Sequence, residues 1–172
     1  MISGVKVVLT SGRPTCSAKN IAKEINAKPY MICDNGASIY NVEQDELISE
    51  ASIDRETVLK IIDTCIHNHI YYMVFTSKEI IVKDLKHMAL AFYKKRHNVN
   101  SEITGISEIK YAGKEYIETV KEPFIRIVVC DEDRPIFNSI VNRLKKYDSV
   151  DLMAPPHVSN KIIQSNRKGY FN

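Results

Sequence analysis

The sequence lacks long apolar runs and a strong net charge, and each absence argues against a class of protein. No apolar run approaches the roughly 20 residues needed to span a bilayer, and the run from Val5 to Leu9 is too short for the apolar region of a signal peptide. The net charge of +3 is weak and dispersed along the 172 residues, which argues against nucleic acid as a partner. We therefore expect a cytoplasmic protein with no membrane partner.

Closely spaced metal ligands are also missing from the sequence. The four cysteines are far apart and form no Cys-x-x-Cys pair, so neither a zinc site nor a disulfide framework is indicated. His67 and His69 alternate near the predicted end of a helix, but no spacing supplies further zinc ligands. Asp131, Glu132 and Asp133 precede a predicted helix and are interpreted as caps rather than ligands. We expect no metal site in this chain.

The first part of the chain has the pattern of a parallel sheet. Val5 to Thr10 is predicted to be a buried strand, and Tyr30 to Cys33 a second one. Between them, a helix is predicted from about Thr15 to Asn26, with one apolar face that includes Ala22 and Ile25. Because strand, helix and strand follow within about 30 residues, they form a βαβ unit, which implies a parallel sheet.

The rest of the chain, from about residue 38 to 163, has the pattern of an α+β module. Helices are expected after Asp54, from Lys86 to His97 and from Pro135. The predicted strands are Ala37–Tyr40, Glu46–Ser52, Ile70–Thr76, Glu79–Lys83, Phe124–Cys130, Val150–Met153 and Val158–Ile163, the last two joined by Pro155-Pro156. We expect an antiparallel sheet with helices on one face.

The strongest local signal is Thr10-Ser11-Gly12-Arg13-Pro14, at the end of the first predicted strand. A hydroxyl group there, followed by glycine and the start of a helix, makes an anion site, because the hydroxyl and the helix amides can bind phosphate together. Arg13 adds a fork of donors. The spacing alone also fits a plain turn between strand and helix.

A second signal, Asp34-Asn35-Gly36-Ala37, follows the next strand and by itself indicates only a turn. Together with Ser11-Gly12-Arg13 it resembles the haloacid dehalogenase (HAD) phosphatases of the Cof type, subfamily IIB. The resemblance implies that Ser11 belongs to the second motif of that family and contacts the substrate phosphate, with Gly12 and Arg13 beside it. Asn35 and Gly36 then lie where the core domain passes into the cap.

The same resemblance implies a domain organisation. Residues 1–37 correspond to part of the HAD-like core, residues 38–163 to the inserted cap, and residues 164–172 to a partial return to the core. Arg167-Lys168-Gly169 fits the place of the third motif, so Lys168 is expected to bind the phosphate. The fold class expected is α/β, a fragment of the parallel core with an α+β cap.

The family's catalytic aspartates have no counterpart in the sequence. Its first motif, Asp-x-Asp-Gly-Thr, supplies the nucleophile and the general acid and base, and its fourth, a Gly-Asp run, holds magnesium. Neither occurs in the 172 residues. We therefore expect no catalytic residue here and no tightly bound Mg²⁺, although the complete family enzyme uses Mg²⁺ on small phosphorylated molecules. The chain is expected to be a truncated, inactive form that is mainly the specificity cap.

Two other functions remain open at this level. The cap fold could serve as a non-catalytic binding or assembly module, with self-association through exposed core strands, because an incomplete parallel sheet leaves edges unpaired. The chain could also be a ligand-binding α+β domain unrelated to phosphatases. A large distance between the first strand and Lys168 would favour that last alternative.

Overall fold

The computed structural model describes residues 7–97, 108–131, 133–147, 150–153 and 162–167. In chain order, the elements are β1 (Leu9–Thr10), α1 (Thr15–Glu24), β2 (Tyr30–Cys33), the 3-10 turn η1 (Asp34–Gly36), β3 (Ser38–Asn41), β4 (Glu46–Glu50), α2 (Arg55–His67), β5 (Tyr71–Thr76), β6 (Glu79–Val82), α3 (Met88–His97), β7 (Glu108–Tyr111), α5 (Lys114–Thr119), β8 (Phe124–Cys130), α6 (Arg134–Leu144), β9 (Val150–Met153) and β10 (Ile162–Arg167). No helix among these residues is long and apolar enough to cross a membrane.

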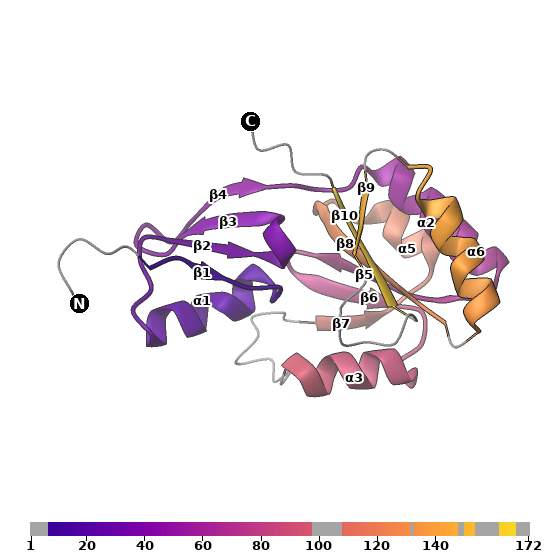
Figure 1. The fold of residues 1–172 in the computed structure, drawn as a ribbon, viewed down its shortest axis with the longest axis horizontal. Coiled ribbons are helices and arrows are strands. Elements are labelled where there is room, and N and C mark those ends of the chain that lie inside the picture. Colours follow the sequence, from indigo (N-terminus) through magenta and orange to yellow (C-terminus); the bar gives the residue numbers. More distant parts are fainter. Residues whose placement is uncertain (1–6, 98–107, 132, 148–149, 154–161, 168–172) are drawn as a thin grey trace.

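The smaller sheet has the strand order β1-β2-β3-β4 and lies at one end of the molecule (Figure 1). β1 pairs with β2 in parallel, with Leu9 opposite Met31, and α1 makes the connection between them. The predicted strand–helix–strand unit is therefore confirmed. β3 and β4 continue the sheet as an antiparallel hairpin, so this sheet extends to Glu50. It therefore includes residues on both sides of the predicted domain boundary between residues 37 and 38. That boundary stays a prediction.

Helix α1 ends two residues earlier than the sequence suggests. Asn26 has a φ of 52°, the left-handed conformation in which helices commonly terminate. Its N–H donates to Lys23 O, and Ala27 N–H donates to Ala22 O at 2.9 Å. This termination turns the chain away from the buried face of the helix. Ile25, which we expected on that face, is therefore 57% exposed, whereas Ala22 is fully buried as predicted.

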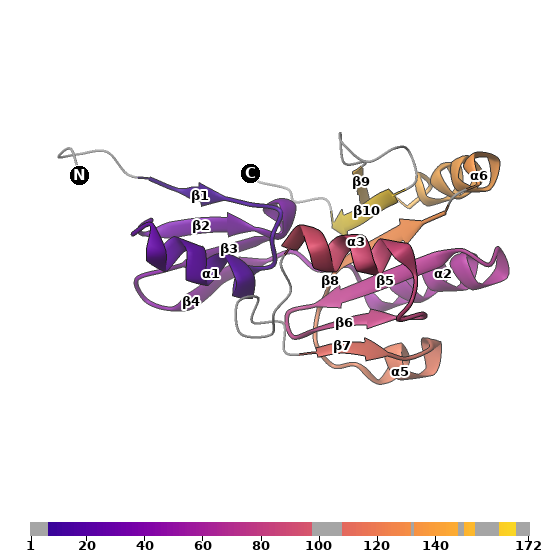
Figure 2. The ribbon, with the colours of Figure 1, turned by 90° about the horizontal axis from the view of Figure 1, so that it is seen from below.

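The larger sheet has the order β7-β6-β5-β8-β10-β9 and a helical layer on each face. Its pairs are antiparallel except for β6 and β7, which are parallel. On one face, Ile61 of α2, Ile117 of α5 and Ile140 of α6 pack in a core with Tyr72 of β5. On the other face lies α3 (Figure 2), whose Leu90 packs with alternate residues of the same strand. The predicted α/β fold class is confirmed, but the helices cover both faces of the larger sheet rather than one, because α3 has its own apolar contacts on the second face.

The last two strands of the chain extend the larger sheet beyond β8. β10 pairs with β8 on one side and with β9 on the other, and Arg167 lies opposite Val150. The predicted antiparallel pair is present, and its second strand extends to Arg167, beyond the predicted end at Ile163, while residues 158–161 of the predicted strand lie outside the described residues. Pro155-Pro156 lies outside the described residues. Residues 164–167 belong to β10 of this sheet. The predicted return of the chain to the core at residue 164 stays a prediction.

Helix capping follows the sequence. Asp54 Oδ1 accepts from Thr57 N–H at 2.8 Å at the start of α2, and Asp133 Oδ1 accepts from Ile136 N–H at 3.0 Å at the start of α6. His69 has a φ of 56° where α2 ends. There, Ile70 N–H donates to Cys65 O at 2.8 Å, so His69 terminates a helix.

Candidate functional site

The loop after β1 presents the hydroxyl group of Ser11 at the start of α1. Ser11 N–H donates to Ile32 O at 2.8 Å, which fixes the loop to the neighbouring strand β2. Ser11 Oγ accepts a hydrogen bond from Arg13 N–H at 3.1 Å. Since the oxygen acts as acceptor in that bond, the hydroxyl proton can be donated to a ligand. The hydroxyl therefore lies at a helix N-terminus, as an anion site requires.

Asp34, the first residue of η1 directly after β2, holds the two predicted motifs together. Its side chain is 3% exposed, and its Oδ2 accepts from Thr15 N–H at 3.2 Å, from Thr15 Oγ1 at 3.1 Å and from Ser38 Oγ at 3.0 Å. In addition, Asp34 N–H donates to Arg13 O at 2.9 Å. A carboxylate at the first residues of α1 also interacts favourably with the positive end of the helix dipole. Sequence reasoning missed Asp34, which only its place directly before Asn35-Gly36 could have indicated.

The side chain of Asn35 lies directly against Gly12. A Cβ atom at position 12 would overlap Oδ1 of Asn35, so only glycine fits without movement. Asn35 and Gly36 have φ values of 58° and 96°, and this left-handed turn directs the Asn35 side chain toward the loop. The structure therefore brings Ser11, Gly12 and Arg13 together with Asn35 and Gly36, although it does not test the roles predicted for them.

A buried arginine from the larger sheet reaches the same loop. Arg126 lies on β8, is 2% exposed, and donates from Nη1 to Gly12 O at 3.2 Å. Its guanidinium carbon lies 4.2 Å from the centroid of the Phe75 ring. Arg126 is separated from Gly12 by 114 positions, so no local sequence pattern could have identified it.

Two carboxylates lie close together beside the turn. Burial, and secondarily the negative charge of Asp34, raises the pKa of Glu50 above its usual value. Glu50 lies opposite Ser38 in the β3–β4 pair, and Ser38 in turn donates to Asp34. The turn therefore places two carboxylates beside the loop that contains Arg13 and that Arg126 of β8 contacts.

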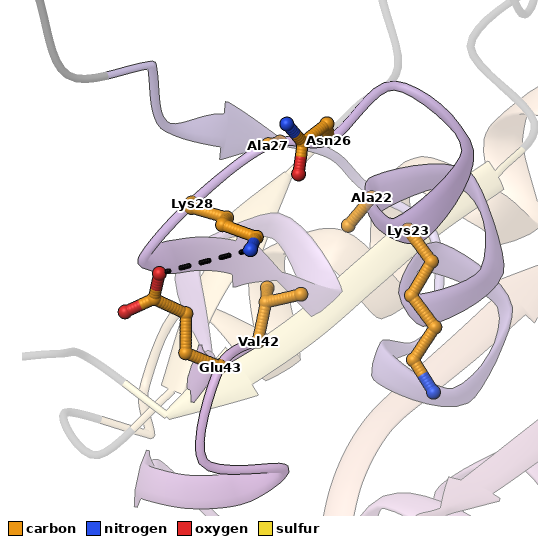
Figure 3. A pocket seen from close by; sticks show the side chains of 7 residues that line it. All are labelled: Ala22, Lys23, Asn26, Ala27, Lys28, Val42 and Glu43. Atoms are coloured by element: carbon orange, nitrogen blue, oxygen red, sulfur yellow. Dashed lines mark ion pairs between the residues drawn. The ribbon is translucent and has the colours of Figure 1, made fainter.

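A cavity of about 310 Å³ lies at the opposite end of α1, among residues of the helix end and of the segments flanking β2 and β3. Figure 3 shows Lys28 and Glu43 pointing toward each other there, at an N–O distance of 4.0 Å, while Lys23 extends away. Helix carbonyls rather than amides face this end, and the helix dipole is negative there. This cavity is therefore a poor site for phosphate and lies apart from the loop at Ser11.

Lys168 lies outside the described residues. Among the residues that the structure describes, no three His, Cys, Asp or Glu side chains group as metal ligands. Cys33, Cys65 and Cys130 are buried, and burial raises the pKa of Cys65 to about 12. The described residues do not by themselves fit a Mg²⁺ site, which needs several oxygen ligands.

The two sheets and the loop between β1 and α1 define the class of protein as an α/β protein of HAD-like architecture. Residues 1–169 match the family of haloacid dehalogenase-like hydrolases. The chain belongs to that family, which confirms the resemblance seen in the sequence.

Solved structures show the same fold at low sequence identity. A haloacid dehalogenase-like hydrolase from Bacteroides thetaiotaomicron superposes with a TM-score of 0.76 at 16% identity, covering 96% of this chain and 59% of its own. One from B. subtilis gives 0.70 at 19% identity, with 95% and 62% covered. A HAD subclass IIB sugar phosphatase gives 0.71 at 15%, with 96% and 58% covered.

The chain spans only part of the length of its relatives. A curated protein of Buchnera aphidicola subsp. Baizongia pistaciae (strain Bp), named "Putative phosphatase", is 29% identical over 91 residues. That match covers 52% of this chain and 34% of the relative. The solved structures are covered over 58–62% of their own length. The activity of a whole relative is therefore only a proposal for this chain.

Proposed function

We propose that the complete protein is a Mg²⁺-dependent phosphatase of the Cof type, acting on small phosphorylated metabolites. The named phosphatases among the similar proteins support the reaction class. The observation that carries the proposal for this chain is the meeting of Ser11, Gly12 and Asn35 at the N-terminus of α1. Bound Mg²⁺ would stabilise charge on the transferring phosphoryl group.

In this proposal the chain's own residues bind and orient the phosphate. The Ser11 hydroxyl donates to a phosphate oxygen, Arg13 contributes charge-assisted hydrogen bonds, and Lys168 adds a second cation. The larger sheet, as the cap, excludes water and selects the leaving group. Since the sequence has no Asp-x-Asp-Gly-Thr, the chain holds the phosphate ester without attacking it.

Phosphate titration followed by amide NMR tests this site. At constant ionic strength, inorganic phosphate should shift the amide signals of Ser11, Gly12, Arg13 and Thr15 in a saturable way. Ser11→Ala should weaken binding by about tenfold, the cost of one charge-assisted hydrogen bond. Ser49→Ala, an exposed serine on β4, is the matched control. Equal affinities for all three proteins would contradict the proposed role of Ser11.

A non-catalytic assembly role is the second candidate, and one observation favours it. β1 is an edge strand of the smaller sheet, and the residues before it, Val7 and Val8, are 51% and 44% exposed. An apolar edge of this kind favours pairing with another chain. Light scattering should then detect a dimer that Val8→Lys dissociates, whereas a monomer at all concentrations would contradict this candidate.

A further inference from the structure

Arg126 has more hydrogen-bonding capacity than its described surroundings use. One nitrogen, Nη1, donates to Gly12 O at 3.2 Å. The other two, Nε and Nη2, are buried and have no hydrogen-bond partner among the described residues. Nor does any described carboxylate pair with this side chain, whose recorded contacts are Gly12 O and the Phe75 ring.

An arrangement of this kind is costly unless an anion completes it. A buried guanidinium loses its hydration, and a single carbonyl and an aromatic face replace only part of it. A lysine here could donate to Gly12 O with its single ammonium group. Arginine has two further donor nitrogens, Nε and Nη2, in a planar fork. That fork matches two oxygens of a phosphate or carboxylate group.

The position of Arg126 limits what this anion can be. Gly12, whose carbonyl it holds, lies between Ser11 and Arg13 at the N-terminus of α1, where the backbone dipole also favours negative charge. The Asp34 carboxylate also lies at the start of α1, but its Oδ2 already accepts three hydrogen bonds, and neither Asp34 nor Glu50 forms an ion pair with Arg126 among the described contacts. The donors near Gly12 therefore suit an oxyanion that enters from outside the described chain.

We propose that Arg126 is a phosphate-binding residue, contributed by the larger sheet to the loop at Ser11. Its Nε and Nη2 bind oxygens of the phosphorylated substrate, and this role rests on the proposed function. Both nitrogens are buried, so the groups that cover them must move before a substrate oxygen can reach them, while Nη1 can keep its hydrogen bond to Gly12 O.

Phosphate affinity measured on three variants tests this assignment. Arg126→Gln should fold, since it removes an uncompensated charge, and should bind inorganic phosphate at least about tenfold more weakly. Arg126→Lys keeps the charge but not the fork, and should recover only part of the affinity. Arg143→Gln, an exposed arginine on α6, should bind like the unchanged chain. Denaturation curves establish that each variant is folded.

The outcomes separate this proposal from the proposed function. If Ser11→Ala weakens binding but a folded Arg126→Gln does not, Arg126 is structural and the phosphate site at Ser11 stands. If Arg126→Gln weakens binding and Ser11→Ala does not, the assignment stands and the role of Ser11 is wrong. An unchanged chain that binds acetate as tightly as phosphate at equal ionic strength overturns the assignment, because the fork then serves a carboxylate of a protein segment. Absence of phosphate binding overturns both proposals.

Discussion

The contact between Gly12 and Asn35 joins two motifs that are separate in the sequence. Gly12→Ala should destabilise the fold by about 1 kcal/mol, because the new Cβ displaces the Asn35 side chain. Asn35→Gly removes that side chain and keeps the left-handed turn. In this background Gly12→Ala should cost measurably less, with a coupling of about 0.5 kcal/mol or more in urea denaturation. Equal costs in both backgrounds would show that the two residues do not interact.

Glu50 makes stability depend on pH. Its pKa is raised in the folded chain by burial and by Asp34, so the protonated form favours folding. That contribution is present in full below the pKa of the unfolded chain and is lost as pH rises through the folded pKa. Glu50→Gln should therefore gain stability relative to the unchanged chain between pH 4 and 7.

The gain for Glu50→Gln should stay under about 1 kcal/mol, because the side chain is partly exposed and its charge is screened. Urea denaturation at several pH values measures it. Glu46→Gln, an exposed change on the same strand, serves as the control. A stability difference for Glu50→Gln that is constant over this pH range would refute the account.

At the scale of elements, Asp34 in η1 connects α1 and β3 through one carboxylate oxygen. Asp34→Asn keeps a residue that tolerates the left-handed φ of 53°, but it removes the charge and one acceptor. The expected loss is about 1–3 kcal/mol, since buried donors are left unpaired. Asp63→Asn breaks an exposed ion pair with Lys114 and should cost less than about 1 kcal/mol. Similar losses of unfolding free energy for both variants in chemical denaturation would argue against a stabilising role of the Asp34 hydrogen bonds.

The elements were predictable where the signal is local. Asp54 and Asp133 cap the helices that the sequence assigns to them, because a cap acts within three residues. Ile25 was misplaced because the left-handed turn at Asn26 ends the helix before it. The last strand extends to Arg167, beyond the predicted end at Ile163, since no local residue in the sequence marks where β10 stops pairing.

The candidate site was predictable only in part, for a related reason. Ser11, Gly12 and Arg13 lie within one loop, and Asn35 follows the strand paired with it, so the sequence pattern could associate them. Arg126 enters through the contact of β8 with that loop, 114 positions away. Contacts of this kind depend on how the sheets meet, which no periodicity in the chain encodes.

At the scale of the whole molecule, we propose that this chain binds a phosphate ester but carries no nucleophile for it. Its sequence has no Asp-x-Asp-Gly-Thr, although its fold is that of the HAD-like hydrolases. The most direct test is a steady-state assay of the purified chain with a generic phosphate ester and Mg²⁺, with Ser11→Ala purified in parallel.

The account predicts no turnover above the rate of the buffer for either protein. A contaminating phosphatase would give equal rates for the two preparations. Turnover at rates typical of enzymes, about 1 per second or faster, that is lost in Ser11→Ala would contradict the account, because a nucleophile would then exist within these 172 residues.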